Sequence, residues 1–87
     1  MEERELKNKI EELGYRYNEW TEEYTKHYDD LYCTAYIEME IDEEYKRDRG
    51  LIHSAYIRQD FIISEQKVIY QIQQAFNRLQ EELKELE

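Results

Sequence analysis

The sequence predicts an all-α protein, an elongated antiparallel helical hairpin that is open to oligomerisation. Three observations favour this fold: apolar and aromatic residues recur every three or four positions, the chain has no proline, and it has only two glycines. We expect one helix over about 2–47, a turn over about 48–51 and a second helix over about 52–86. Together they would form a single helical-hairpin domain that spans residues 1–87.

The first expected helix carries a stripe of large side chains. Steps of three or four residues place these side chains along one side of a continuous helix. Gly14 lies within the pattern and is interpreted as a glycine that the helix tolerates, with a kink or a close helix approach as the alternative. The stripe consists of Leu6, Ile10, Leu13, Tyr17, Trp20, Tyr24, Tyr28 and Leu31.

Residues 33–42 are the segment in which helix and strand compete. Cys33, Ala35 and Ile37 alternate with polar or aromatic residues, and alternation is typical of a half-buried strand. The acidic residues on the other face and the lack of a nearby tight turn favour a helix instead. We predict a helix here, whereas a lone strand would need a partner chain.

The sequence KRDRG at 46–50 is the strongest break in the pattern. Basic residues suit the C-terminal end of a helix, and Gly50 can adopt the left-handed conformation that often ends one. The apolar spacing then resumes, with a second row that widens the stripe and predicts more than one neighbour. The main row is Leu51, Ala55, Ile62, Ile69, Ile72, Phe76, Leu79, Leu83 and Leu86, and the second row is Ile52, Tyr56, Ile63 and Tyr70.

The charge and composition of the chain exclude several classes of protein. A net charge of −10 argues against binding to nucleic acid or to an anionic membrane, since both require clustered lysine and arginine. No stretch approaches the roughly 20 apolar residues of a membrane span, and the N-terminus lacks the apolar core of a secretory signal. We therefore expect a cytoplasmic location, with export alongside a partner as the alternative. The single cysteine, Cys33, is expected to be a small buried residue.

Groups that could support catalysis are numerous but poorly arranged. His27 and His53 are far apart in the sequence, and neither lies in a recognised metal-binding spacing. Glu23 and His27 would share a helix face, yet a second such pair is missing. Because phosphate-binding and nucleophile motifs are also missing, we expect no catalytic, cofactor-binding or metal-binding residues, and no enzyme activity.

The tyrosines and the tryptophan predict a protein-binding role. Tyr and Trp bury a large area while keeping a polar tip, so an aromatic stripe on an acidic helix suits docking against the helices of a larger protein. We therefore expect a non-enzymatic adaptor or chaperone. The expected partner-binding residues are Tyr17, Trp20, Tyr24, Tyr28, Leu31, Tyr32, Tyr36, Ile62, Ile69, Ile72 and Phe76.

The segment RGLIHSAYIRQDFIISEQKVIYQIQQAFNRLQEELKEL, residues 49–86, resembles the small partner proteins of bacterial type VII secretion. These are the WXG-like hairpins and the small helical targeting factors that accompany LXG-type toxins. The resemblance implies binding to the helical N-terminal domain of a toxin and delivery of that toxin to the secretion machine. One feature departs from the pattern: Trp20 is followed by Thr21 and Glu22, so the WXG turn is absent.

Two other functions fit parts of the sequence. Between Lys26 and Lys46 there are seven acidic residues and no basic one, so the chain could imitate DNA phosphates and inhibit a nucleic-acid-binding protein. The apolar spacing also fits a self-assembling coiled coil, which would form a homo-oligomer without another protein.

Overall fold

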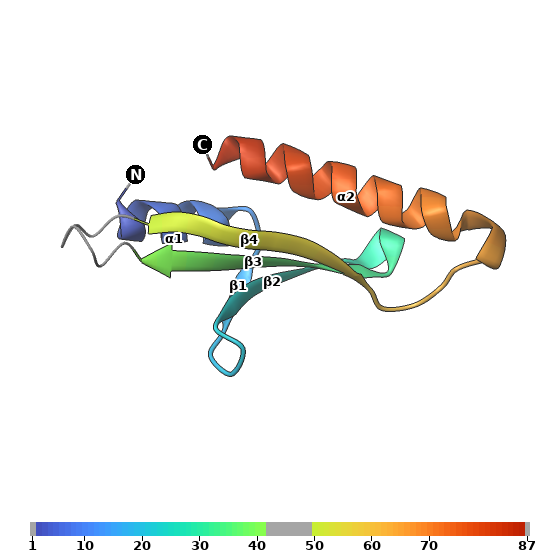
Figure 1. Ribbon diagram of the computed structural model, residues 1–87, viewed down its shortest axis with the longest axis horizontal. Helices are drawn as coiled ribbons and strands as arrows, with labels where there is room; N and C mark the ends of the chain where they lie inside the picture. Colours follow the sequence, from blue (N-terminus) through green and yellow to red (C-terminus); the bar gives the residue numbers. More distant parts are fainter. Residues whose placement is uncertain (1, 42–49, 87) are drawn as a thin grey trace.

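The computed structural model describes residues 2–41 and 50–86, and its fold is α+β (Figure 1). Two helices accompany four strands, and two short 3-10 turns connect them. In chain order the elements are α1 (Glu3–Glu12), β1 (Arg16–Asn18), β2 (Glu23–Tyr28), η1 (Asp29–Leu31), β3 (Cys33–Ile41), β4 (Gly50–Gln59), η2 (Glu65–Lys67) and α2 (Val68–Glu85).

The predicted all-α hairpin and the predicted coiled coil are therefore wrong. The described part of the first expected helix, about 2–47, is α1 followed by three strands, and residues 42–47 lie outside the described residues. The second expected helix, about 52–86, begins inside β4 before it becomes α2. Side chains alternate between the two faces of a strand, so residues four positions apart lie on the same face. Residues four positions apart also share one face of a helix, so the spacing of Tyr24 and Tyr28 fits both structures. The expected turn at about 48–51 lies partly outside the described residues, and its last two positions, Gly50 and Leu51, belong to β4.

The four strands form one antiparallel sheet in the order β1-β2-β3-β4. In this meander Tyr28 lies opposite Cys33 and Ala35 lies opposite Ile57. The register between β3 and β4 shifts at Glu38/Met39. Strand β4 therefore forms one edge of the sheet and β1 forms the other.

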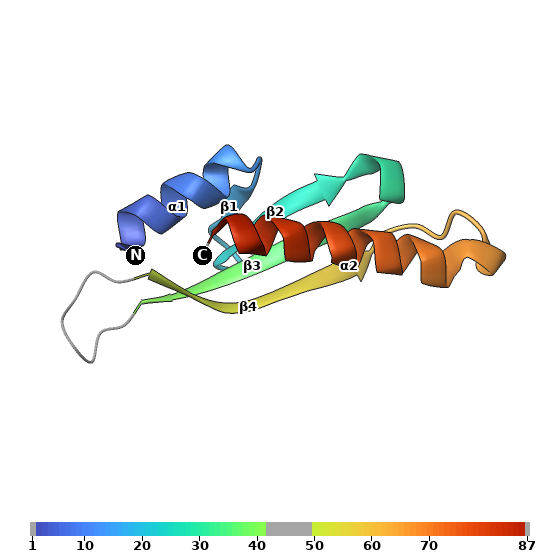
Figure 2. The same ribbon diagram turned by 90° about the horizontal axis from the view of Figure 1, so that it is seen from above.

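Both helices pack on the same face of the sheet, where they enclose one hydrophobic core (Figure 2). Alternate residues of β2 and β3 point into this core, as the period of two requires. The alternation in residues 33–41 was thus a strand signal, and Asp42 lies outside the described residues. The core consists of Leu6, Ile10, Tyr15, Tyr24, Tyr28, Cys33, Ala35, Ile37, Ala75, Leu79 and Leu86.

Gly14 ends α1 and turns the chain into β1. Its φ angle is +100°, a conformation that glycine adopts without steric cost. The amide of Gly14 donates to Glu11 O at 2.9 Å, and that of Tyr15 donates to Ile10 O at 3.4 Å, which is the pairing of a Schellman cap. Neither a tolerated glycine within a helix nor a kink describes this residue, because the helix stops there.

The buried row of α2 differs from the expected one. Gln71, Ala75 and Glu82 are buried together with Leu79 and Leu86. Ile69, Ile72 and Phe76 lie on a neighbouring side of the helix and remain largely exposed. The sequence therefore identified the later part of the buried row, Leu79 and Leu86, but not the part of the face that Gln71 and Ala75 bury.

Candidate functional site

The predicted partner-binding residues do not form one continuous stripe. The rings of Tyr24, Tyr28 and Tyr36 are buried and Leu31 is partly buried, so these four belong to the fold itself. The others are exposed but separate into two surfaces. Tyr17 and Trp20 lie at the β1–β2 turn, whereas Tyr32, Ile62, Ile69, Ile72 and Phe76 lie on or near α2.

Trp20 occupies the turn between β1 and β2, which projects away from the side covered by α2 (Figure 1). Its side chain is 96% exposed. The side-chain oxygen of Asn18 accepts hydrogen bonds from the amides of Trp20 at 2.9 Å and Thr21 at 3.4 Å. Glu22 adopts a φ of +58°, and its amide donates to Asn18 O at 2.8 Å, which closes the turn. The turn is thus held by its own hydrogen bonds while the indole is left free.

Tyr17 and three glutamates surround the turn. The ring of Tyr17 is half-exposed and meets the buried ring of Tyr24 edge-on, with centroids 5.1 Å apart. The glutamates are Glu19, Glu22 and Glu23, and Glu23 accepts a hydrogen bond of 2.5 Å from the hydroxyl of Tyr56. This bond raises the pKa of Tyr56 to about 12. The surroundings of Trp20 are therefore acidic.

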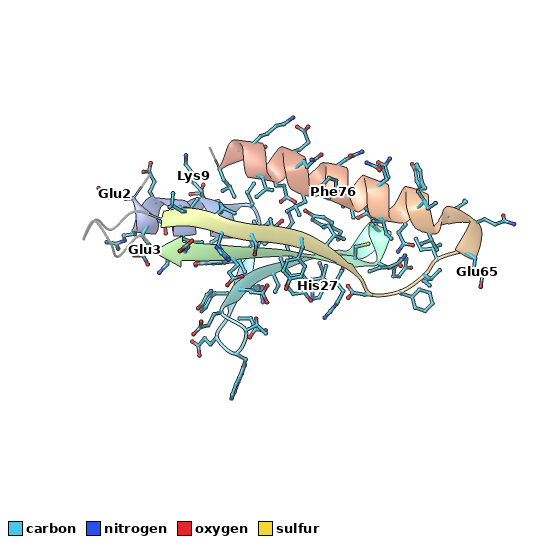
Figure 3. The ribbon with its side chains drawn as sticks, in the orientation of Figure 1. Glu2, Glu3, Lys9, His27, Glu65 and Phe76 are labelled. Carbon is cyan, nitrogen blue, oxygen red and sulfur yellow. The ribbon has the colours of Figure 1, made fainter. Side chains whose placement is uncertain are left out.

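The second exposed surface combines a helix side with a strand edge. We call it the α2–β4 surface, and it consists of Ile69, Ile72 and Phe76 together with the outer edge of β4. Phe76 lies below α2, beside β4, in Figure 3. The loop before α2 adds Phe61, Ile62 and Ile63, all largely exposed. Sequence reasoning did not select Phe61 or Ile63 as partner-binding residues, although their run of apolar side chains could have indicated it.

Gln71 holds the N-terminal part of α2 against this loop. Its side chain is 1% exposed and donates to Leu31 O at 2.5 Å and to Phe61 O at 2.8 Å. The amide oxygen accepts from Gln59 Nε2 at 3.1 Å. One buried amide therefore joins η1, the end of β4 and the loop to α2.

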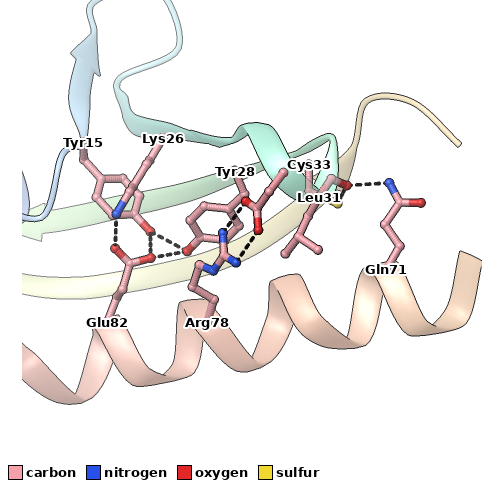
Figure 4. A network of polar contacts seen from close by, with 9 residues as sticks. Tyr15, Lys26, Tyr28, Leu31, Cys33, Gln71, Arg78 and Glu82 are labelled. Atoms are coloured by element: carbon pink, nitrogen blue, oxygen red, sulfur yellow. Dashed lines mark hydrogen bonds and ion pairs between the residues drawn. The ribbon is translucent and has the colours of Figure 1, made fainter. Parts of the chain in front are cut away.

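A buried polar network joins α2 to β2 further along the helix (Figure 4). Lys26 Nζ lies 2.7 Å from Glu82 Oε2 and donates to Leu13 O at 2.6 Å. The hydroxyls of Tyr15 and Tyr28 are 3.2 Å apart, and both donate to Glu82 Oε1. Burial, together with these contacts to Glu82, raises the pKa of both tyrosines far above the usual value. At neutral pH the network holds two neutral phenols beside one ion pair.

The sheet face opposite the helices carries a shallow depression of about 460 Å³. His27, labelled in Figure 3, lies on this face, and its Nδ1 is 2.9 Å from Thr34 Oγ1. Thr34 in turn donates to Asp60, which also pairs with Arg58 at 2.9 Å. Although burial would raise it, hydrogen bonds from Thr34 and Arg58 keep the pKa of Asp60 below its usual value. These polar groups satisfy one another rather than converge on an open site.

The described residues contain neither a candidate metal site nor a candidate membrane span. In the ranges 2–41 and 50–86, no group of three His, Cys, Asp or Glu side chains could hold a metal ion. None of the helices in those ranges combines the length and the apolar character of a membrane span. Cys33 is buried, and burial raises the pKa of its thiol.

Comparison with protein-family models, with curated proteins and with solved structures gives no match to this chain.

Proposed function

We propose that this chain is a non-enzymatic adaptor that captures a larger protein through Trp20. The observation that carries the proposal is the 96% exposure of Trp20 on a turn that Asn18 holds in shape. Tryptophan is strongly enriched among the few residues that dominate binding energy at protein interfaces. A Trp side chain that contributes little to the fold is therefore best explained by a partner that covers it.

The turn is suited to binding because little order has to be gained. Burial of about 200 Å² of indole surface contributes roughly 5 kcal/mol before the costs of association. Those costs are lower when the loop already has its bound shape. The hydrogen bonds from the amides of Trp20 and Thr21 to Asn18 supply that preorganisation.

The acidic surroundings define the chemistry of the partner. Glu19 and Glu22 flank Trp20, so the complementary surface is an apolar pocket bordered by lysine or arginine. Such a pocket can be formed by the helices of a larger protein. The resemblance to type VII secretion partners depended on a helical hairpin, so the partner is defined here by its chemistry instead.

Inhibition of a nucleic-acid-binding protein is a second candidate function. Glu23, Glu38 and Glu40 lie on the sheet face that the helices leave open, and residues 19–44 contain ten acidic residues against one basic residue, Lys26. A basic groove that normally holds nucleic acid would be attracted to such a face. On this hypothesis the complex would weaken steeply with salt and would depend on the glutamates more than on the indole.

The test is parallel affinity capture with the wild type, Trp20→Ala and Tyr70→Ala. Tyr70 is a matched control, since it is a largely exposed ring on α2, distant from the β1–β2 turn. We expect one protein to be retained by the wild type and by Tyr70→Ala but lost with Trp20→Ala. Calorimetry with that purified protein should then show a dissociation constant raised at least about 30-fold by Trp20→Ala, or roughly 2 kcal/mol.

Equal capture by the wild type and Trp20→Ala would reject the proposal. Replacing Glu38 and Glu40 with lysine separates the two candidate functions. Loss of a nucleic-acid-binding protein on this charge reversal, with Trp20→Ala unaffected, would favour the acidic mimic.

A further inference from the structure

In the part of the chain that the structure describes, the outer edge of β4 is open to strand pairing. This strand has ten residues, and no strand in the described ranges pairs with its outer side. Residues 54–59 pair regularly with 38–33 on the inner side, so the strand is well ordered up to its end. A long exposed edge with unpaired amides and carbonyls is usually shortened, charged or covered in native proteins. Strand β4 shows neither shortening nor a run of charges, and its one register shift, between Ile52 and Ser54, leaves residues 54–59 regular.

The exposed apolar side of α2 lies along this same edge. Arg78, on the other side of the helix, pairs with Asp30 of η1 at 2.7 Å, which fixes how α2 is rotated. Ile69, Ile72 and Phe76 follow one another at helical spacing on the side away from Arg78, and Ile69 is 84% exposed. Gln71, which lies between Ile69 and Ile72, bonds to Phe61 and Ile63 of the loop after β4, so the side chains of Ile69 and Ile72 lie beside that loop. Phe76, further along the helix, lies nearer to β4.

The segment of the chain that provides this surface carries little net charge. Residues 51–80 contain two acidic residues, Asp60 and Glu65, and three basic ones, Arg58, Lys67 and Arg78, for a net charge of +1. The other residues therefore carry a net charge of −11, which together with +1 gives the total of −10. Two copies could approach each other through this surface with little repulsion, whereas a strongly basic partner would be drawn to the other parts of the molecule.

We propose that two copies of this chain form a dimer with twofold symmetry through the α2–β4 surface. Strand β4 pairs antiparallel with its counterpart, which joins the two sheets into one of eight strands. The two α2 helices then lie side by side on one face, with Ile69, Ile72 and Phe76 between them. The two α2 helices would then be about two strand spacings apart, or about 10 Å, which matches the distance between packed helices.

This dimer covers both the outer edge of β4 and the exposed apolar side of α2. A helical partner would cover the apolar side of α2 but would leave the amides of β4 unpaired. A second copy supplies both a strand and an apolar helix side, and the antiparallel arrangement makes the surface complementary to itself.

The test compares the solution mass of the wild type with that of two variants on α2. Phe76→Glu places a charge in the proposed interface, whereas Tyr70→Glu places one on a different side of the same helix at a similarly exposed ring. Sedimentation equilibrium should give twice the chain mass of 10.9 kDa for the wild type and for Tyr70→Glu. Phe76→Glu should raise the dimer dissociation constant at least about 100-fold.

Amide hydrogen exchange tests the strand pairing separately from the helix contact. The outward amides of β4 should exchange slowly in the wild-type dimer and rapidly in Phe76→Glu, while those of β3 stay protected in both. Circular dichroism of Phe76→Glu should remain that of the folded wild type, because the ring is half-exposed.

Three results would overturn the dimer. They are a wild-type monomer at about 1 mM chain, a dimer that Phe76→Glu leaves intact, and rapid exchange of the β4 amides in an otherwise stable dimer. If the wild type were monomeric and Phe76→Glu lost a captured protein, the surface would belong to a different chain. Trp20→Ala should leave the dimer unchanged, so failure of the adaptor proposal and failure of the dimer can be told apart.

Discussion

Lys26 of β2 and Glu82 of α2 form an ion pair, with Nζ 2.7 Å from Oε2, although 56 positions separate them in the sequence. The Glu82 side chain is 10% exposed and that of Lys26 is 28% exposed. Lys26 also lies over the rings of Tyr15 and Tyr28, at 5.6 and 5.8 Å from their centroids. The pair therefore fixes α2 at one position along the sheet.

Replacing Lys26 with methionine should destabilise the fold, because Glu82 would lose its ion-pair partner in a largely buried position. We expect the free energy of unfolding in urea to fall by about 2–3 kcal/mol, less than for a fully buried pair because Lys26 is partly exposed. Lys7→Met removes a partly exposed pair with Glu3 within α1 and should cost about 0.5 kcal/mol. The double variant Lys26→Met with Glu82→Leu should recover part of the loss, and a Lys26→Met variant as stable as Lys7→Met would contradict this account.

Gln71→Leu should be among the most damaging single substitutions in α2. It leaves the carbonyls of Leu31 and Phe61 without their donor in a partly buried place, so we expect a loss of about 1–3 kcal/mol in thermal or urea unfolding. Gln73→Leu is the control, because Gln73 is exposed and pairs with Asn77 on the helix surface. Similar stabilities for the two variants would show that Gln71 does not hold the helix.

Trp20→Ala should leave the stability of the fold unchanged to within about 0.5 kcal/mol, since an exposed side chain contributes little to it. Leu79→Ala, at a buried position of the core, should cost about 2–5 kcal/mol in the same urea titration. A clear loss of stability in Trp20→Ala would show that the indole packs on the protein, and would remove the reason to assign it to a partner.

The protein should lose stability in alkali. The folded state raises the pKa of Tyr15, Tyr24 and Tyr28 above the ordinary 10.0, mainly through burial. Because the folded state holds these protons more tightly than the unfolded chain, their contribution is complete below pH 10 and is lost as the pH rises toward the folded pKa values. Tyrosinate absorbance should therefore appear late and together with the loss of circular dichroism.

Tyr56 provides a local check on this titration. Its pKa of about 12 is caused first by the hydrogen bond to Glu23, and only then by burial. Glu23→Gln should shift the titration of this one tyrosine back toward 10.0 without unfolding the protein. A titration curve that is the same in Glu23→Gln and in the wild type would contradict the assigned cause.

The sequence indicated the helices better than the strands. Leu6, Ile10 and Leu13 predicted α1, because the three-residue step from Ile10 to Leu13 fits a helix and not one face of a strand. The seven-residue step from Leu79 to Leu86 predicted the later part of α2 for the same reason. Tyr24 and Tyr28 favoured the wrong prediction of a helix, because a step of four residues fits both a helix and one face of a strand. The alternation in Cys33–Ile41 was the correct signal, but it was outweighed by the absence of nearby turn residues.

The separation of the candidate site into two surfaces could not be predicted from local patterns. Trp20 was selected because it fits a helical stripe, whereas it is exposed because Asn18 closes a turn two residues earlier. The face that α2 buries depends on Gln71 and Glu82, two polar residues that reach partners 40 and 54–67 positions away. Hydropathy alone would place both residues outside the core.

The exposure of Trp20 has a practical consequence, since it is the only tryptophan in the chain. Its fluorescence should resemble that of free indole in water in the folded protein and should change little when the protein unfolds. Burial of this ring against another protein would shift the emission to shorter wavelength. The unmodified chain therefore carries its own optical reporter of capture, one that responds to a bound partner and is almost insensitive to folding.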